Sequence, residues 1–134
     1  MQYFGGKSGL TQPSAWYISL HTGDPGDTAG SSEVSTGGGT LYARQQILNI
    51  GNAGAGRWVD VTAANPNVMT NNATITFPTS GASWGTITWF GVWDASTAGN
   101  YLGRGQLASS VVVGGAGITV SFAASALQLT IAPT

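Results

Sequence analysis

Few residues in this sequence could perform acid–base or metal chemistry. Cysteine is absent, and there is a single histidine, His21. Without thiolates, zinc and iron–sulfur sites built on cysteine are excluded, and a lone imidazole does not complete a histidine-based metal site. A serine hydrolase would also depend on His21 as its histidine base. We therefore expect no enzyme activity, no catalytic residue, no metal ligand and no cofactor, and we expect His21 to be an outward or rim residue on the first strand.

The carboxylates offer two further kinds of chemistry. They number five, and they are Asp24, Asp27, Glu33, Asp60 and Asp94. A glycosidase needs two of them across a cleft, and Ca²⁺ would need several of their oxygens. Asp24, Asp27 and Glu33 lie in one long glycine-rich segment, 23–39, whose spacing matches no EF-hand loop. Whether this loop binds an ion or a glycan stays open, and solvated or turn-forming carboxylates are the alternative.

Arg44 and Asp94 are the charged residues with an expected structural role. Arg44 follows Tyr42 and Ala43 within an expected strand, and Asp94 ends another. An unpaired buried charge is expensive. We therefore predict an ion pair of Arg44 with Asp94 or with Asp24, which would fix loop 23–39 or a subunit contact. Simple exposure of both side chains is the alternative.

The composition limits the partners of the chain. Only 7% of the 134 residues are charged, the formal net charge is −1, and 42% are hydrophobic, including five tryptophans. Nucleic-acid binding draws its affinity from clustered cations, which are missing here. Disorder is also not expected, because disordered chains combine low hydrophobicity with high charge. The surface must then be covered either by uncharged polar side chains or by other subunits.

Hydrophobic alternation with a period of two predicts an all-β fold. Strands are expected near 15–22, 40–50, 57–62, 73–77, 85–94, 100–107, 109–113, 118–122 and 127–132. Hairpin turns are expected at 96–100 and 114–117, and no window has a convincing helical stripe. This pattern indicates one antiparallel β-sandwich domain over 1–134, jelly-roll-like, with eight or nine short strands and an N-terminal arm at 1–14. We expect no signal peptide and no membrane span.

One strand, residues 86–94, is apolar on both faces. Ile87, Trp89 and Trp93 are expected on one face, with Phe90 and Val92 on the other. The strand is either central in the sandwich and covered by a loop, or it meets another subunit. On the second interpretation the interface residues are Trp84, Trp89, Phe90 and Trp93.

Five segments in order resemble a family of small tailed-bacteriophage virion proteins. They are YISLHTGDPG at 17–26, YARQ at 42–45, ITFP at 75–78, the block from WGTIT at 84–88 to Leu107, and the ending with GITVSF at 117–122 and ALQLT at 126–130. Members are commonly labelled phage tail fibre or minor tail proteins, and capsid decoration (cement) proteins are similar in size and type. The resemblance implies a structural virion role and supplies no catalytic residues.

Three functions follow from these observations as hypotheses. The first is a non-enzymatic capsid decoration protein that bridges and stabilises major-capsid subunits. The second is a tail fibre, tail tip or adaptor component, and the third is a glycan-binding module whose tryptophans stack on sugars. For the first two we expect a homo-oligomer, with a trimer favoured, bound to other virion proteins and to neither nucleic acid nor membrane. The protein would be assembled into the virion in the bacterial host cytoplasm.

Overall fold

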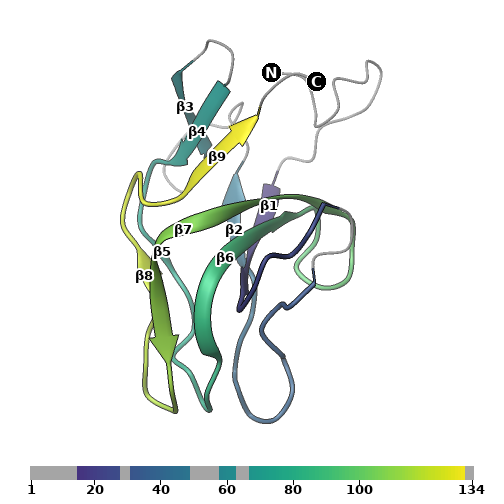
Figure 1. The fold of residues 1–134 in the computed structure, drawn as a ribbon, viewed down its shortest axis with the longest axis vertical. Coiled ribbons are helices and arrows are strands. Elements are labelled where there is room, and N and C mark those ends of the chain that lie inside the picture. The colour runs from purple at the N-terminus through teal and green to yellow at the C-terminus, as the bar shows by residue number, and fades with distance from the viewer. Residues whose placement is uncertain (1–14, 28–30, 49–57, 63–66, 132–134) are drawn as a thin grey trace.

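A computed structural model describes residues 15–27, 31–48, 58–62 and 67–131, and these form an all-β, antiparallel structure (Figure 1). The strands of the described residues are, in chain order, β1 (Ala15–His21), β2 (Gln45–Leu48), β3 (Trp58–Thr62), β4 (Asn67–Asn71), β5 (Ile75–Thr76), β6 (Gly85–Trp93), β7 (Tyr101–Val113), β8 (Ser121–Phe122) and β9 (Gln128–Ile131). The predicted fold class, antiparallel all-β, is confirmed, and the residues that the structure describes contain no helix. In the described part of the chain no helix is long and apolar enough to cross a membrane.

The largest sheet has four strands in the order β2-β1-β6-β7. Its inner face supplies apolar side chains at alternate positions of β1, namely Trp16, Ile18 and Leu20, each at most 1% exposed. The opposite residues of β6, such as Val92 across from Ile18 and Phe90 across from Leu20, continue this inner face. Alternation of side chains in paired strands thus places one apolar layer on one side of the sheet.

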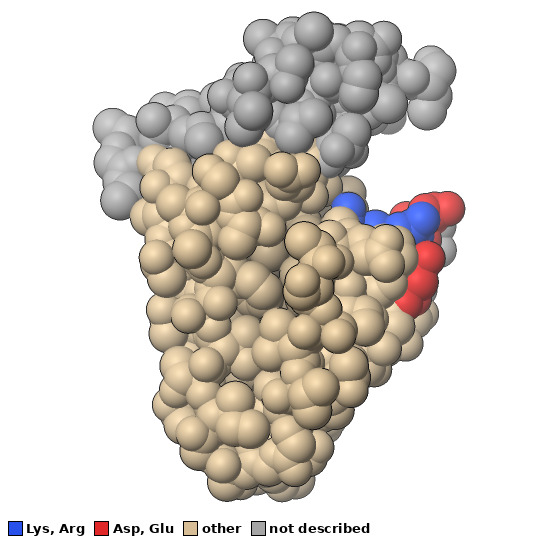
Figure 2. Space-filling model, turned by 60° about the vertical axis from the view of Figure 1, so that its left-hand side comes forward, with Lys and Arg blue, Asp and Glu red and all other residues tan. Residues whose placement is uncertain are grey.

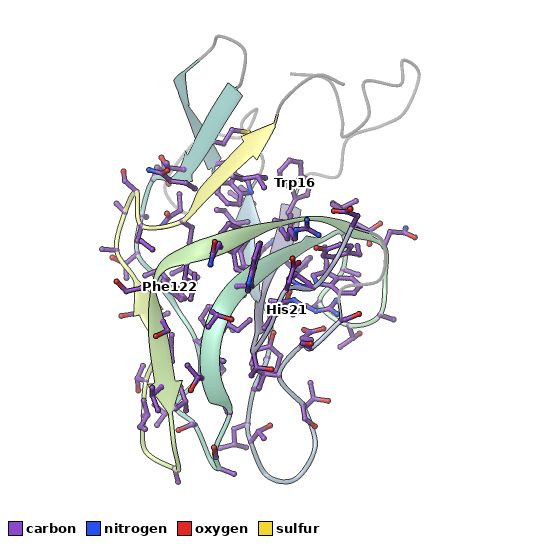
Figure 3. All side chains as sticks on the ribbon, viewed as in Figure 1. Trp16, His21 and Phe122 are labelled. Atoms are coloured by element: carbon purple, nitrogen blue, oxygen red, sulfur yellow. The ribbon has the colours of Figure 1, made fainter. Side chains whose placement is uncertain are left out.

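Two smaller sheets close the other side of the same core. They have the orders β3-β4-β9 and β5-β8. Trp58 and Met69 come from the first, and Phe122 from the second, and all three belong to one hydrophobic cluster with Trp16 of the large sheet (Figure 3). The sheets therefore pack around a shared core, as a sandwich does. The jelly-roll connectivity stays a prediction.

The observed strands differ from the expected ones in three places. Strand β4 was not anticipated, because its residues NVMTN resemble a turn more than a strand in composition. The expected break at residue 108 does not interrupt β7, which runs over 13 residues with an irregular register opposite Ile87 and Trp89. The glycine run 114–117 turns the chain but makes no hairpin, since β7 pairs with β6 whereas β8 pairs with β5. The N-terminal arm at 1–14 lies outside the described residues.

The register shift in β6 also corrects the expected faces of the aromatic strand. Ile87, Phe90 and Val92 join the core, and Trp89 does not. Between the pairs Ile87–Val111 and Trp89–Gln106 the register shifts, because one residue of β6 separates these pairs whereas four residues of β7 do; at this irregularity Ile87 and Trp89 do not share a face, although strict alternation would put them together. The outer face of the large sheet therefore carries Trp89 and Trp93, with Gly91 between them.

Gly105 of β7 lies where the large sheet closely approaches β9, and substituting it tests this contact. A Cβ at this position would overlap the ring of Phe90 and lie 2.9 Å from the carbonyl oxygen of Gln128 on β9. We expect Gly105→Ala to lower the free energy of unfolding by about 1–3 kcal/mol, the usual range for overpacking. Urea denaturation measures the loss. Gly114→Ala is the matched control, because nothing lies within 4 Å of its added methyl, and equal effects of the two substitutions would contradict the close approach.

Candidate functional site

The polar residues that could do chemistry gather on the outer face of the large sheet, under the segment that connects β1 and β2. This connection folds back along β1: Thr22 N donates to the carbonyl of Ser32 (3.0 Å) and Val34 N to that of Leu20 (2.9 Å). An isolated antiparallel bridge joins His21 to Glu33. Side chains on the outer face of β1 are thereby buried although they point away from the core.

His21, labelled in Figure 3, is one of these side chains. It faces outward from β1 as predicted, but the loop buries it fully, so it does not lie at an open rim. Its Nδ1 lies 2.6 Å from the carbonyl oxygen of Ser31, and its Nε2 lies 2.7 Å from Ser19 Oγ. A carbonyl only accepts, so Nδ1 carries the proton and Nε2 accepts from the hydroxyl of Ser19. Trp93 Nε1 donates to the same hydroxyl over 2.8 Å.

The chain of bonds from Trp93 through Ser19 and His21 ends at the carbonyl of the exposed residue Ser31, and its first three members are buried. Ser19 is 0% exposed, so its hydroxyl is not presented to a substrate. Gly91 lies beside it, and a Cβ there would come within 2.5 Å of Ser19 Oγ and 2.8 Å of His21 Nε2. Burial, as the largest cause, lowers the pKa of His21, partly offset by the bond to Ser31. In this structure the arrangement holds a neutral imidazole in one tautomer and fastens the loop to the sheet.

Tyr42 accepts the hydrogen bond of a backbone N–H on the edge of β1 that no backbone carbonyl accepts. Its hydroxyl accepts from Leu20 N (2.9 Å) and donates to Glu33 Oε1 (2.9 Å). The pairing of β1 with β2 ends at Ile18, which lies opposite Gln45, and the carbonyl of Leu20 accepts from Val34 N. The Tyr42 hydroxyl therefore binds β1 just beyond the end of its pairing with β2. Burial, followed by the charge of Glu33, raises the pKa of the Tyr42 hydroxyl far above its usual range.

Arg44 binds the loop and the β6–β7 turn together. Its guanidinium makes two bonds to the carboxylate of Glu33 (2.8 and 2.7 Å) and donates to the carbonyls of Ala95 (3.1 Å) and Ala98 (2.9 Å). It also lies 3.7 Å from the ring centroid of Trp93. The side chain is 8% exposed. Bidentate bonding, two carbonyls and an aromatic face satisfy this nearly buried charge.

The carboxylate partner of Arg44 differs from both predicted ones. Among the described residues its ion pair is with Glu33, and neither Asp94 nor Asp24 takes that place. Asp94 accepts instead from the backbone N (2.7 Å) and the side-chain Nδ2 (2.8 Å) of Asn100, and these bonds lower its pKa. It therefore closes the turn between β6 and β7, in which Ala98 and Gly99 have positive φ. The sequence could not show that the folded-back loop brings Glu33, not Asp94, opposite Arg44.

Asp24 and Asp27 belong to a second, more exposed ion pair. Arg104 of β7 lies 2.7 Å from Asp27 Oδ1 and 3.3 Å from Asp24 Oδ1. Nearby, the Tyr101 hydroxyl donates to the carbonyl of Gly26 (2.9 Å), and burial raises the pKa of Tyr101 to about 12. The three acids of the loop thus each face an arginine. Within the described residues no group of three or more His, Cys, Asp or Glu side chains could hold a metal ion.

The charged side chains that the structure describes all belong to the Arg44 ion pair, the Arg104 ion pair or the turn between β6 and β7. They are Asp24, Asp27, Glu33, Arg44, Asp94 and Arg104. Figure 2 shows the consequence for one side of the molecule, where blue and red atoms gather at one edge and the rest of the described surface is uncharged. The described surface on that side is therefore uncharged apart from this edge.

The four predicted interface aromatics are not equally available to a partner. Trp84, Phe90 and Trp93 are buried within the chain itself, at 5%, 0% and 8% exposure. Trp84 donates from Nε1 to the carbonyl of Thr40 (2.9 Å), and Arg44 covers Trp93. The prediction of a central strand covered by a loop accounts for these three residues. Trp89 stays partly exposed, and the guanidinium carbon of Arg104 lies 5.5 Å from the centroid of the Trp89 ring. A sugar could not stack on Trp84 or Trp93 in this structure.

One sequence motif that is typical of hydrolases was not considered when we predicted that no residue is catalytic. Residues 81–85, Gly-Ala-Ser-Trp-Gly, have the letter pattern of the nucleophile elbow of α/β-hydrolases. That elbow lies between a strand and a helix, but here strand β6 follows and Ser83 donates to the carbonyl of Val113 (3.0 Å) and accepts from Gly85 N (3.2 Å). The sole histidine is already bound to Ser19 and Ser31. Ser83 thus forms a corner at the start of β6.

A family model matches residues 1–130 of the chain, and its description is podophage GP4 fiber I protein gp80. The chain belongs to this family. The match spans both ion-pair groups and nearly the whole sequence, and it confirms the resemblance to phage tail fibre-type virion proteins. The family is that of a phage fibre structural protein, so the chain is a virion component. No curated protein matches the sequence significantly.

Arg44 yields a stability prediction for this gp80-family protein. We expect Arg44→Met to lower the free energy of unfolding by about 3–5 kcal/mol, because it leaves the partly buried carboxylate of Glu33 without its charged partner. Urea denaturation measures the change. Arg104→Met is the control: its partners Asp24 and Asp27 are 52% and 86% exposed, so a loss of at most about 1 kcal/mol is expected. Equal losses would show that Arg44 is an ordinary surface cation.

His21 yields a prediction of pH dependence. The unfolded imidazole, with a pKa of about 6.5, takes up a proton that the buried imidazole resists, since its pKa is lowered. The free energy of unfolding should therefore fall as pH drops from 7.5 to 5.5, with a slope of up to about 1.4 kcal/mol per pH unit. Thermal unfolding across this range gives the slope. In His21→Gln, which removes the sole histidine, the slope should flatten; an unchanged slope would assign it to other groups.

Proposed function

We propose that this chain is a non-enzymatic structural subunit of a tail fibre, or of an adaptor or tip that belongs to it, on a tailed phage. The observation that carries the proposal is the family match over residues 1–130, whose printed description is that of a podophage fibre protein. Capsid decoration, the first hypothesis from the sequence, has less support, because that description names a fibre and no shell protein.

The absence of enzymatic activity is part of the proposal. It is supported by how the reactive groups are occupied: Ser19, His21 and Ser83 each have hydrogen-bond partners within the chain. Glu33 and Asp94 are likewise bound, to Arg44 and Asn100. Polar groups used in this way stabilise a loop and two turns, which suits a rigid subunit.

Rigidity is the property that a fibre subunit needs from this arrangement. The connection between β1 and β2 is fixed to the sheet by Ser31, Glu33, Tyr42 and Arg44 through bonds of 2.6 to 3.1 Å. Long surface connections are usually the most mobile parts of a domain. We propose that these bonds give a small domain a fixed shape. Copies of the chain would form a homo-oligomer, with a trimer favoured, and would bind other virion proteins during assembly in the host cytoplasm.

Immunogold electron microscopy of intact virions tests the proposed place on the particle. Antibodies raised against the purified chain should label the tail region, and quantitative mass spectrometry should give a few to tens of copies per particle. Labelling over the whole shell, with hundreds of copies, would overturn the proposal in favour of capsid decoration. Particles without the protein give a second measurement: their heads should resist heat and chelators as well as complete particles do.

A further inference from the structure

The hydroxyl of Ser19 lies between two nitrogen atoms and satisfies both only while His21 is neutral. Trp93 Nε1 lies 2.8 Å from Ser19 Oγ and can only donate to it. The proton of Ser19 therefore points to His21 Nε2, 2.7 Å away, which must be unprotonated to accept it. Within the described residues the Ser19 side chain has no other hydrogen-bond partner. Ser19 and His21 are both fully buried, so bonds within the chain decide whether these atoms are satisfied.

A second proton on the imidazole of His21 removes this complementarity. When a proton from water binds Nε2, that nitrogen becomes a donor, and Nδ1 already donates to the carbonyl of Ser31 over 2.6 Å. The oxygen of Ser19 then faces two donors, and its own proton has no acceptor. A buried charge and a buried unsatisfied hydroxyl are both unfavourable. The protonated form is therefore favoured only where Nε2 can reach solvent.

The charged groups on the connection between β1 and β2 do not remove this conflict. Glu33 lies across from His21 in the isolated bridge, and its charge favours the imidazolium. Arg44, which is bound to Glu33, disfavours it. Tyr42 stays neutral, because burial and the charge of Glu33 raise the pKa of its hydroxyl far above its usual range. The two opposite charges thus offset each other at the ring.

The strands beside His21 bring no further charge to its ring. The residue opposite it on β6 is Trp89, which does not titrate. On β7, burial raises the pKa of Tyr101 to about 12, so its hydroxyl is neutral at physiological and mildly acidic pH. Arg104 is held in its own ion pair with two acids of the connection. Burial and hydrogen bonding therefore control the protonation of His21.

We infer that mild acid opens the connection locally at Ser31 and Ser32, with protonation of His21 as the trigger, while the sheets stay folded. This conformational switch does not rest on the proposed function, and it is distinct from the fall in overall stability predicted above. Ser31 and Ser32 are the part of the cover over His21 that can move most readily, because both are exposed. Ser32 also has a φ of 64°, a conformation that non-glycine residues rarely adopt, so it gains freedom when it opens.

The bonds along the connection give the opening a boundary. The carbonyl of Ser32 accepts from Thr22 N over 3.0 Å, and this bond must break when the segment leaves β1. The next residue, Glu33, is held by its ion pair, and Val34 N donates to a carbonyl of β1 over 2.9 Å. Neither of these two attachments uses His21. The amide of Thr22 therefore reports the opening, and the second half of the connection stays in place.

Amide hydrogen exchange of the full-length chain, followed by NMR at about pH 7.5 and about pH 5.0, tests the inference. Protection factors, from which the intrinsic pH dependence of exchange is removed, report the opening equilibrium. We expect the protection factor of Thr22 to be at least about fivefold lower at pH 5.0. The upper limit is about 30-fold, which follows from a pKa of about 6.5 for an imidazole in water. An unchanged protection factor would overturn the inference.

Low concentrations of urea distinguish a local opening from global unfolding, because the urea dependence scales with the surface that becomes exposed. At pH 5.0 the exchange of Thr22 should be nearly independent of urea. Phe77 is the control, since its buried amide donates to the carbonyl of Val120 over 2.8 Å in another sheet. Its exchange should rise steeply with urea. Equal urea dependence of the two amides would mean that Thr22 exchanges only through global unfolding, and would overturn the inference.

His21→Gln tests the trigger. The amide of glutamine offers an acceptor and a donor, as the neutral imidazole does, but does not titrate in this range. The protection factor of Thr22 in this variant should agree within about twofold at the two pH values. A decrease as large as that of the wild-type chain would overturn the role of His21. If the variant does not fold, the NMR titration of His21 in the wild-type chain decides: an imidazole that takes up its proton while Thr22 stays protected overturns the inference.

Discussion

The Arg44–Glu33 pair is the interaction on which the rest of the outer face depends. Arg44 joins the loop, through Glu33, to the turn between β6 and β7, through Ala95 and Ala98. Glu33 in turn accepts from Tyr42, which completes the edge of β1. In a chain with 7% charged residues, a nearly buried ion pair persists because every charged atom has a nearby partner. Its stabilising effect arises from the connections that it makes between three segments.

Two separate polar systems thus hold the same connection. The ion pair and Tyr42 fix its second half, while the bond from His21 to Ser31 and the Arg104 pair fix its first. The Arg44 pair is nearly buried and the Arg104 pair is largely exposed, so salt should weaken the Arg104 pair more than the Arg44 pair. The covered surface includes Ser19, Trp93 and Gly91, which would otherwise form a polar and aromatic strip open to solvent.

The sequence was sufficient for the fold class and for most of the strands, because alternation reports directly which side of a sheet a residue faces. It failed where geometry depended on a neighbouring strand: the faces of β6 change where additional residues of β7 lie opposite Thr88, and β4 is a strand through its pairing with β3 and β9. The need of Arg44 for a carboxylate followed from charge alone, but the choice of Glu33 did not. That choice depends on a loop that folds back along β1, for which no local pattern exists. The burial of His21 was missed for the same reason.

The backbone N of Leu20 donates to the phenol hydroxyl of Tyr42 and not to a backbone carbonyl, and this affects which parts of the loop can vary. The segment between Val34 and Thr40 leaves the edge of β1 and returns without contributing a bond to that edge. Its tip, Gly37 to Gly39, is exposed, and a Cβ at Gly38 or Gly39 would meet nothing within 4 Å. Tyr42 secures the register on one side of this tip and Val34 on the other, and the carbonyl oxygen of Gly39 packs closely against Gly81, so the room for added residues lies at Gly37 and Gly38. Insertions or a grafted peptide at the tip would change what the subunit displays without altering the fold that displays it.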